Sequence, residues 1–581
     1  SSTLPFSSAS ENICIGALAG LNITTGTKNI ILGSGPDLAN STAGNIDTGD
    51  NNIIMGYKSG NNLQNGSQNI LLGTESGKSV TSNNNIMIGY QSGFSEFAGE
   101  SNIMIGDESG YFQSGGTENI FIGSKSGYTN NDGNYLINIG DKAGYTGVEA
   151  NNNINLGFEA GYFTTKSNSI AIGYKAGRSN ASGTNNIFIG SEAGAGSNAD
   201  TDINLINNGS ITGTSNMMFG NKSGKDLTSG LGNILFGFRA GENITTGSKN
   251  ILIGNFAGKS ESNSDTIFNR NIMIGIASNT INAGTGTEAE LSSISGIGSK
   301  TTKNDNIFIG IDVGLENITG NNNIFMGKNA GRQNTQGEFN INIGTGSGSQ
   351  TTIGDNNISI GQNSNLNNTT GDNNIAIGRD AGMGNTNTTP GENNISIGFR
   401  AGFNNATNDS IFIGNQAGKE NILGVSNIFI GKNSGLSSSF GYRNIAIGED
   451  AGKNLDANKD PSSTSSLTLA SYSNISNLSA QQDLGVSYQN ILIGFSAGSQ
   501  TTSYENLFIG SEAGKTNRTG FRNIYIGSKS GMNSTNNYNI FVGAESGITN
   551  TTGQYNLYFG YRSGFNNTTG NNNSFLGYQS G

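Results

Sequence analysis

One short phrase of amino acids recurs along this chain of 581 residues and constrains its fold more than any other feature. The copy at residues 168–177 reads NSIAIGYKAG, and the general form is Asn-Ile-x-Ile-Gly, two variable residues, Ala or Ser, and Gly. Successive copies start 16 or 17 residues apart, as at Asn69, Asn85 and Asn102. A fixed short period indicates a repeat array that grows along one axis and is not divided into separate globular cores.

The length of the repeat selects the kind of array. A unit of 16 or 17 residues is too short for a pair of helices or for a leucine-rich repeat. The Ile-x-Ile segment alternates with period two and is β-branched, which indicates a strand. Counting the asparagine as position zero, glycines at positions four, eight and often fourteen indicate turns with positive φ or close backbone approach. The sequence therefore predicts an all-β fold, a parallel β-solenoid or β-roll of about thirty coils.

The spacing of the repeat predicts the domain organisation. Residues 1–11 form an N-terminal segment, and residues 12–581 are predicted to form a single continuous solenoid. Four stretches interrupt the period and are predicted inserts: 34–51, 259–270, 276–305 and 453–489. A solenoid tolerates inserts at its turns because each coil contacts only its neighbours. We interpret the inserts as plain loops, with dedicated binding loops as the alternative.

Side-chain alternation assigns an inner and an outer face to each strand. Positions one and three point the same way, so Ile13, Ile15 and their equivalents are expected to fill the interior with the small residue at position seven. Position two is then expected to face outward, although it is often large and apolar.

An exposed apolar stripe of that length exceeds what a soluble monomer normally shows. We therefore predict that position two packs against other copies of the chain or against a second layer of the same chain, with simple β-propensity as the alternative. The self-association candidates are Phe121, Phe188, Phe308, Phe325, Phe412, Phe429, Phe508, Tyr525, Phe541, Tyr558 and Phe575.

Two further patterns concern packing between coils. Position zero is asparagine in nearly every copy, and amides stacked at one register can hydrogen-bond along the axis as an asparagine ladder. We interpret this column as structural rather than as a set of ligands. Position two turns small or polar at Asn342, Ser359, Ala376 and Ser396, which predicts looser packing there.

Asn-x-Ser/Thr sequons cluster at positions ten and eleven of the coil. This placement predicts N-linked glycan along one exposed turn. The alternative is that turn chemistry and the abundance of asparagine explain the pattern without sugar. The glycosylation candidates are Asn22, Asn180, Asn243, Asn317, Asn368, Asn405, Asn517, Asn533, Asn550 and Asn567.

The residues needed for common catalytic and metal sites are missing. The chain has no histidine, which excludes His-based acid–base catalysis, Ser-His-Asp triads and His metal sites. Its single cysteine, Cys14, excludes a Cys-rich zinc site and an intrachain disulfide. Carboxylates that recur at position six are interpreted as keeping a turn solvated: Glu75, Glu108, Glu159, Glu192 and Glu512. We expect neither an enzyme nor a cofactor.

The charge and hydropathy of the chain limit the kinds of partner that it is expected to bind. The net charge is −11 and basic residues form no run, which argues against nucleic acid. No run of about 18 apolar residues occurs, so we expect no membrane-spanning helix.

The phrase NSIAIGYKAG resembles the head repeats of trimeric autotransporter adhesins, which are bacterial surface fibres. Their consensus also has Asn-Ser-x-Ala-Ile-Gly followed by small residues and glycine. The resemblance covers most of the chain and implies a left-handed parallel β-roll in which three chains pack through outward apolar residues. The coil is longer here, and neither a heptad stalk nor C-terminal anchor strands are seen. A head-like rod is therefore expected rather than a complete adhesin.

Together these patterns favour a structural subunit of an extracellular or cell-surface fibre that associates with itself laterally, head-to-tail, or both. The alternative is an adhesin or a viral or phage fibre that binds a receptor or glycan through the inserts 276–305 and 453–489. Ice binding ranks lower because too many coils lack a pair of threonines.

Overall fold

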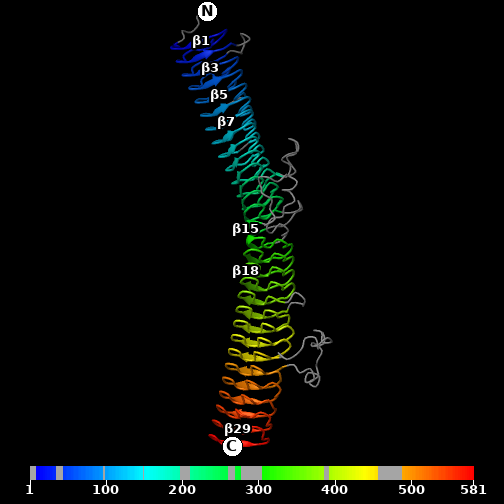
Figure 1. Cartoon of the computed structure of the whole chain (residues 1–581). Coiled ribbons are helices and arrows are strands. Elements are labelled where there is room, and N and C mark those ends of the chain that lie inside the picture. Colours follow the sequence, from blue (N-terminus) through cyan, green and yellow to red (C-terminus); the bar gives the residue numbers. More distant parts are fainter. Residues whose placement is uncertain are drawn as a thin grey trace, which may run out of the picture. The chain divides into compact units, whose positions relative to one another are not determined.

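The computed structural model describes residues 8–34, 43–95, 98–147, 150–196, 210–259, 269–276, 304–384, 391–455 and 487–581. The chain divides into two compact units, Ser1–Asp305 and Asn306–Gly581, and each unit is a stack of coils (Figure 1). The boundary falls at the end of the predicted insert 276–305. Most of each of the inserts 259–270, 276–305 and 453–489, and of the N-terminal segment, lies outside the described residues, as do residues 35–42 of the first insert.

Each coil of the described parts contributes one short strand. The first unit contains β1 (Ile13–Ile15), β2 (Ile30–Leu32), β3 (Ile53–Met55), β4 (Ile70–Leu72), β5 (Ile86–Ile88), β6 (Ile103–Ile105), β7 (Ile120–Ile122), β8 (Ile137–Ile139), β9 (Ile154–Leu156), β10 (Ile170–Ile172), β11 (Ile187–Ile189), β12 (Met217–Phe219), β13 (Ile234–Phe236), β14 (Ile251–Ile253) and β15 (Ile272–Ile276). The second contains β16 (Ile307–Ile311), β17 (Ile324–Met326), β18 (Ile341–Ile343), β19 (Ile358–Ile360), β20 (Ile375–Ile377), β21 (Ile395–Ile397), β22 (Ile411–Ile413), β23 (Ile428–Ile430), β24 (Ile445–Ile447), β25 (Ile491–Ile493), β26 (Leu507–Ile509), β27 (Ile524–Ile526), β28 (Ile540–Val542), β29 (Leu557–Phe559) and β30 (Ser574–Leu576).

The strands of each unit form a parallel ladder in sequence order. In the pairing of β10 with β11, Ile170 lies opposite Ile187 and Ile172 lies opposite Ile189, so each position of the repeat stacks on the same position of the next coil. The predicted all-β parallel β-solenoid is therefore confirmed. The left-handed sense stays a prediction.

The glycines of the repeat form the turns as predicted. In the coil that starts at Asn52, Gly56 and Gly60 have φ of 138° and 60°, values that favour glycine. Gly66, at position fourteen, has another reason to be glycine, because a Cβ there would lie 2.5 Å from the carbonyl oxygen of Ser82 in the next coil. Glycine is therefore needed at Gly56 and Gly60 for the positive φ, and at Gly66 because the neighbouring coil approaches closely.

The interior is lined by position two, so the predicted assignment of the two strand faces is wrong. Phe121 is fully buried, whereas Ile120 and Ile122 beside it are only partly buried. The cause is the turn after the strand, which folds back over position two. A Cβ on Gly127 would lie 2.8 Å from the Phe121 ring, so glycine at position eight lets this layer close on the ring.

This packing also overturns the predicted self-association residues. Ten of the eleven candidates are fully buried by their own chain and cannot reach another molecule in the folded state: Phe121, Phe188, Phe308, Phe325, Phe412, Phe429, Phe508, Tyr525, Phe541 and Tyr558. The eleventh, Phe575, is partly buried and packs against the same core. The second layer that covers position two belongs to the same coil, which was the other arrangement considered.

Aromatic residues at position two stack directly on one another. The rings of Phe508, Tyr525, Phe541 and Tyr558 are nearly parallel, with centroids 4.7, 5.0 and 4.6 Å apart. These distances match the strand spacing of about 4.8 Å, so in-register coils bring like rings into contact.

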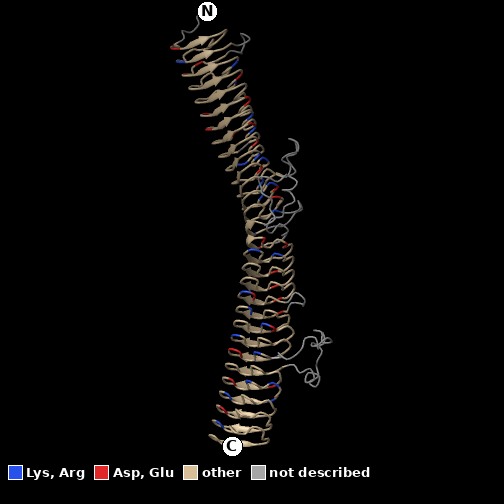
Figure 2. Ribbon diagram, viewed as in Figure 1, with Lys and Arg blue, Asp and Glu red and all other residues tan. Residues whose placement is uncertain are grey.

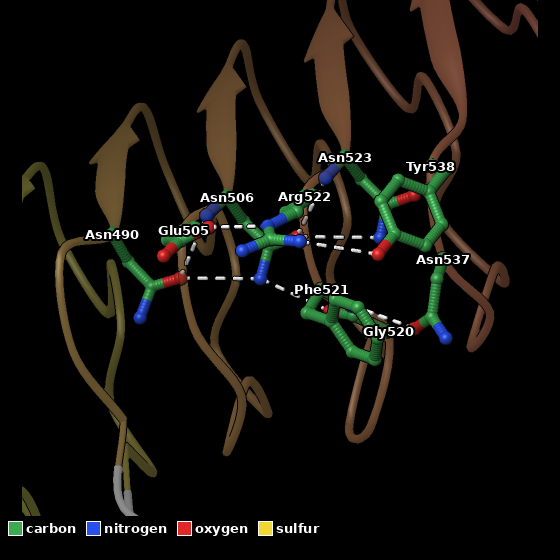
Figure 3. Close-up of polar contacts among 9 residues, drawn as sticks. All are labelled: Asn490, Glu505, Asn506, Gly520, Phe521, Arg522, Asn523, Asn537 and Tyr538. Carbon is green, nitrogen blue, oxygen red and sulfur yellow. Dashed lines mark hydrogen bonds and ion pairs between the residues drawn. The ribbon is translucent and has the colours of Figure 1, made fainter. Parts of the chain in front are cut away.

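The asparagine ladder is confirmed. The backbone N–H and the side-chain Nδ2 of Asn52 both donate to Oδ1 of Asn29 in the preceding coil, each at 2.9 Å. Nδ2 of Asn52 also donates to the carbonyl oxygen of Gly66 in its own coil at 2.9 Å. One buried amide therefore joins two coils and closes its own coil, and Figure 3 shows the same column at Asn490, Asn506 and Asn523.

Replacing an inner and an outer strand residue tests the assignment of faces. We expect Phe429→Ala to lower the free energy of unfolding by about 3–5 kcal/mol, because it removes a fully buried ring that packs against the ring of Phe412. The neighbouring Ile428→Ala, on the outer face, is expected to cost no more than about 1–2 kcal/mol. Urea denaturation followed by circular dichroism measures both values. A larger loss of stability for Ile428→Ala than for Phe429→Ala would indicate that positions one and three, and not position two, fill the interior.

Strain in the turns gives a second prediction. Lys142, at position six, has a φ of 54°, and a left-handed backbone costs an L-residue about 1–2 kcal/mol. Lys142→Gly is therefore expected to raise the free energy of unfolding by about 1 kcal/mol. The adjacent exposed Asp141 does not have a positive φ, so Asp141→Gly is expected to lower it by about 0.5–1 kcal/mol. Destabilisation by both variants in urea denaturation would argue against strain at position six.

Candidate functional site

An apolar sheet face is the most extended surface feature of each unit. Side chains at positions one and three point out of the coil, and many keep a large exposed fraction, such as 42% for Met55, 56% for Phe236 and 52% for Phe559. None of the thirty described strands contains a charged residue. Figure 2 shows the lysine, arginine, aspartate and glutamate residues along the turns instead. We call the outward side chains of positions one and three the Ile-x-Ile face.

Aromatic and charged residues border this face. Tyr135 and Tyr555 lie two residues before their strands and are exposed, and Tyr90 and Phe495 follow theirs at position five and are also exposed. An apolar centre with a polar rim is the usual anatomy of a protein–protein interface, and such interfaces are enriched in aromatic residues.

Ion pairs stabilise the rim between neighbouring coils. Arg522 Nε contacts Glu505 Oε2 at 2.5 Å, and Arg522 Nη1 donates to the Tyr538 hydroxyl at 3.2 Å (Figure 3). The hydrogen bond to Glu505 raises the pKa of Arg522. Lys432 and Glu449, at position five of successive coils, make a similar pair at 2.9 Å. These charged groups are already paired within the chain. The apolar centre of the face is therefore the part that is open to another molecule.

The size of the face suits a macromolecular partner. Fifteen strands at about 4.8 Å spacing and about 10 Å in length give roughly 700 Å² of sheet in each unit. A stable interface buries about 800 Å² on each partner. Isolated exposed apolar residues are ordinary on protein surfaces, but a continuous patch of this size marks an interaction site.

A second surface feature, absent from the sequence-based expectations, is a column of stacked rings at position nine of the first unit. Neighbouring rings lie 4.7–5.3 Å apart, between centroids, and are nearly parallel: Phe94, Tyr111, Tyr128, Tyr145 and Tyr162. The same position in the flanking coils is a cation at both ends, since Lys78 lies 4.4 Å from the Phe94 centroid and Arg178 lies 5.3 Å from the Tyr162 centroid. Because each ring face is covered by the next ring, only ring edges are open to a ligand, and we interpret the column as structural.

Six of the ten predicted glycosylation asparagines are buried, so their placement on an exposed turn is wrong: Asn180, Asn317, Asn368, Asn405, Asn517 and Asn550. At position eleven the side chain points into the coil. For example, Asn517 accepts from the backbone N–H of Gly520 at 2.7 Å and donates to its carbonyl oxygen at 3.1 Å. Other coils carry Leu63, Val80 and Leu227 at this position, which was the available signal that it is interior.

The remaining four sequons stay as predictions. Asn22 is exposed, and Asn243, Asn533 and Asn567 are half-buried. Because a glycan must be attached through Nδ2 and extend into solvent, only these four of the candidates are open to modification in the folded coil.

The carboxylates of position six form ion pairs rather than catalytic pairs. Glu75 contacts Lys78 at 3.1 Å and Glu512 contacts Lys515 at 2.6 Å. Glu108 contacts Lys125 of the next coil at 3.3 Å. The described parts of the chain contain no cluster of acidic or cysteine side chains that could hold a metal ion.

A more buried set of charges lies where three coils of the first unit meet. Arg239 contacts Glu242 at 3.4 Å, and Lys225 contacts Glu192 at 3.2 Å. Burial raises the pKa of the carboxyl groups of Glu242 and Asp226, against the opposing effect of the neighbouring cations. Because acidic and basic groups are intermixed, we interpret this set as a partly desolvated ion network.

The chain matches no family model, and no curated protein matches it. The described residues contain no helix long and apolar enough to cross a membrane. The functional argument therefore depends on the geometry of the surface, and the Ile-x-Ile face is its main feature.

The buried Asp226 gives a pH-dependent prediction. Since burial raises the pKa of Asp226 in the folded state, the folded chain binds this proton more tightly than the unfolded chain does. This carboxyl therefore lowers stability as pH rises from its unfolded pKa of about 4 through the folded value. Asp226→Asn removes that loss, so we expect the variant to be more stable than the parent at pH 7 and the gain to disappear near pH 3.

Urea denaturation at several pH values measures this difference. The matched control is Asp107→Asn, because Asp107 is exposed at a turn. The control is expected to show little change with pH. A gain for Asp226→Asn that is the same at pH 3 and pH 7 would contradict the assignment.

Proposed function

We propose that this chain is a structural subunit of an extracellular or cell-surface fibre, in which solenoid units associate side by side through their Ile-x-Ile faces. The observation that carries the proposal is that position three of every described strand is a partly or largely exposed apolar side chain, with an apolar residue at position one in all of them but β30. Lateral association is thus assigned to positions one and three, in place of the buried aromatic residues of position two.

The favoured occupant of the face is a second copy of the chain. Both copies carry the same strand spacing, so ridges of side chains on one face match grooves on the other over the whole length of a unit. The estimated area approaches that of a stable interface, and no strand residue brings a charge that would have to be desolvated.

The resemblance of NSIAIGYKAG to the head repeats of trimeric autotransporter adhesins supports the same role. In that family, chains pack through outward apolar residues of a parallel β-roll, which is the role proposed here for the Ile-x-Ile face. The family resemblance is also the support for the extracellular or cell-surface location and for three chains in one cross-section. The adhesin alternative depends on the inserts 276–305 and 453–489, of which only a few flanking residues are described.

Charges placed on the face test the proposal. The face variant combines Met55→Glu, Phe236→Glu and Phe559→Glu, all at exposed position-three sites. We expect the parent chain to associate laterally and the variant to associate at least about tenfold more weakly, because three carboxylates would be desolvated in an apolar contact. Sedimentation velocity over a concentration series measures association, and negative-stain microscopy shows whether particles lie side by side.

A matched control separates the face from the added charge. Gln64→Glu, Asn131→Glu and Thr552→Glu add the same charge at exposed turn positions and are expected to leave association unchanged. Circular dichroism must show that all three proteins keep the β-solenoid. Lateral association through this face would be refuted if the parent chain is monomeric at every concentration. It would also be refuted if the face variant associates as tightly as the control.

A further inference from the structure

Position five of the repeat adds a third column to the Ile-x-Ile face. It lies two residues beyond position three, so along an extended backbone its side chain points to the same side. In most coils it begins the turn, but β15 and β16 continue through it to Ile276 and Ile311, which are 41% and 39% exposed. A molecule that covers the Ile-x-Ile face therefore also meets the residues of position five.

The charged residues of this column differ in sign between the two units. In the described coils of the first unit, position five carries two acidic residues and no basic residue: Asp107 and Asp141. In the described coils of the second unit it carries three basic residues and one acidic residue: Lys328, Arg379, Lys432 and Glu449. Lys432 and Glu449 pair with each other at 2.9 Å, so they add no net charge. The column is therefore acidic in the first unit and basic in the second.

The remaining four charges are available to another molecule. Asp107, Asp141, Lys328 and Arg379 are all exposed. The first three make no ion pair with any described residue of the chain. Arg379 lies 3.9 Å from Asp380, and 59% of its side chain is open to solvent. None of these charges would have to give up a strong internal ion pair to bind a partner.

Position six, beside this column, carries charges that do not alter the contrast. They are of both signs in each unit, and many pair within the chain. Examples are Glu108 with Lys125 at 3.3 Å in the first unit and Glu545 with Arg562 at 2.6 Å in the second. Their fields over the face largely cancel, so position five decides the sign of this edge.

Two faces can pack against each other in two ways that keep their strands aligned. When the strands run antiparallel across the contact, the coil axes run in the same direction and position five meets the opposite edge of the partner face. When the strands run parallel, the coil axes run in opposite directions and the two position-five columns meet. In this second arrangement, a first unit placed against another first unit brings acids together, whereas a first unit placed against a second unit joins acids to bases.

The spacing of the charges suits this contact. Asp107 and Asp141 follow β6 and β8, two coils apart, which is about 10 Å at the strand spacing. Lys328 and Arg379 follow β17 and β20, three coils apart, which is about 14 Å. The difference is one coil, which the long and flexible side chains of lysine and arginine can span. Both acids can therefore reach a cation in a single arrangement of the two units.

We propose that the first unit of one copy binds the second unit of another copy through the Ile-x-Ile face, with the position-five columns together and the coil axes in opposite directions. This inference rests on the lateral association proposed above, and it names the surface that each unit recognises. The apolar side chains supply the contact area. The charges select the partner unit and its direction, because like charges placed against each other disfavour the other pairings.

Reversing the charges tests the pairing. The acidic-column variant combines Asp107→Lys and Asp141→Lys, and the basic-column variant combines Lys328→Glu and Arg379→Glu. We expect each to associate at least about tenfold more weakly than the parent chain in sedimentation velocity, because each brings like charges together. The variant with all four substitutions is expected to associate as tightly as the parent, because opposite charges meet again. Circular dichroism must show that every variant keeps the β-solenoid.

A matched control separates the column from net charge. Asp47→Lys and Asp132→Lys make the same change in net charge at exposed positions outside the column. Both this control and the acidic-column variant make the chain less negative, so net charge alone would strengthen association in both. We expect the control to associate at least as tightly as the parent, and the acidic-column variant to associate more weakly.

The outcomes distinguish this pairing from lateral association itself. If the parent chain associates and either column variant associates as tightly as the parent, the pairing of unlike units is overturned while lateral association stands. The same holds if the variant with all four substitutions associates as weakly as the two column variants. A parent chain that is monomeric at every concentration overturns both proposals.

Discussion

The structure depends on in-register stacking, which places every residue of a coil against its own equivalent in the next. Burying an amide normally costs several kcal/mol unless both its donor and its acceptor are paired. In this chain the pairing is supplied by repetition, since Asn233 bonds to Asn216 and Asn250 bonds to Asn233 through the same atoms. Where serine replaces asparagine the chain of bonds continues in part, because Ser410 Oγ accepts from the backbone N–H of Asn427 at 3.2 Å. A polar interior is therefore stable only as long as the period is kept.

The backbone-dependent features could be predicted from sequence, and the assignment of faces could not. Period, parallel strands, turn glycines and the asparagine ladder all follow from the recurrence of Asn, Ile-x-Ile and Gly. Both faces of the strand are apolar, however, so alternation at Ile120, Phe121 and Ile122 does not say which face is inside. That choice is made by the turn at Gly127, which closes over the phenyl ring. The sequons were misplaced for a related reason, because polar Asn517 occupies an interior position that is Leu63 in another coil.

The interior is not uniform along the second unit. Looser packing was predicted where position two becomes small, and there Ser359, Ala376 and Ser396 are buried inside the coil rather than placed on an outer contact. Elsewhere the same position forms continuous aromatic stacks, as at Tyr525 and Phe541. A solenoid coil contacts only its neighbouring coils, so coils with small and coils with large residues at position two can follow each other without disturbing distant parts.

The asparagine column also gives each unit an electrical direction. In many coils Nδ2 of the later asparagine donates to Oδ1 of the earlier one, as from Asn506 to Asn490 and from Asn523 to Asn506. Strand dipoles nearly cancel in a sheet, but these side-chain dipoles point the same way and add, like the peptide dipoles of a helix. The positive end lies toward the first coil. In the proposed lateral association, this field would favour a pair of copies that run in opposite directions, so the residue that joins the coils would also contribute to the polarity of a bundle.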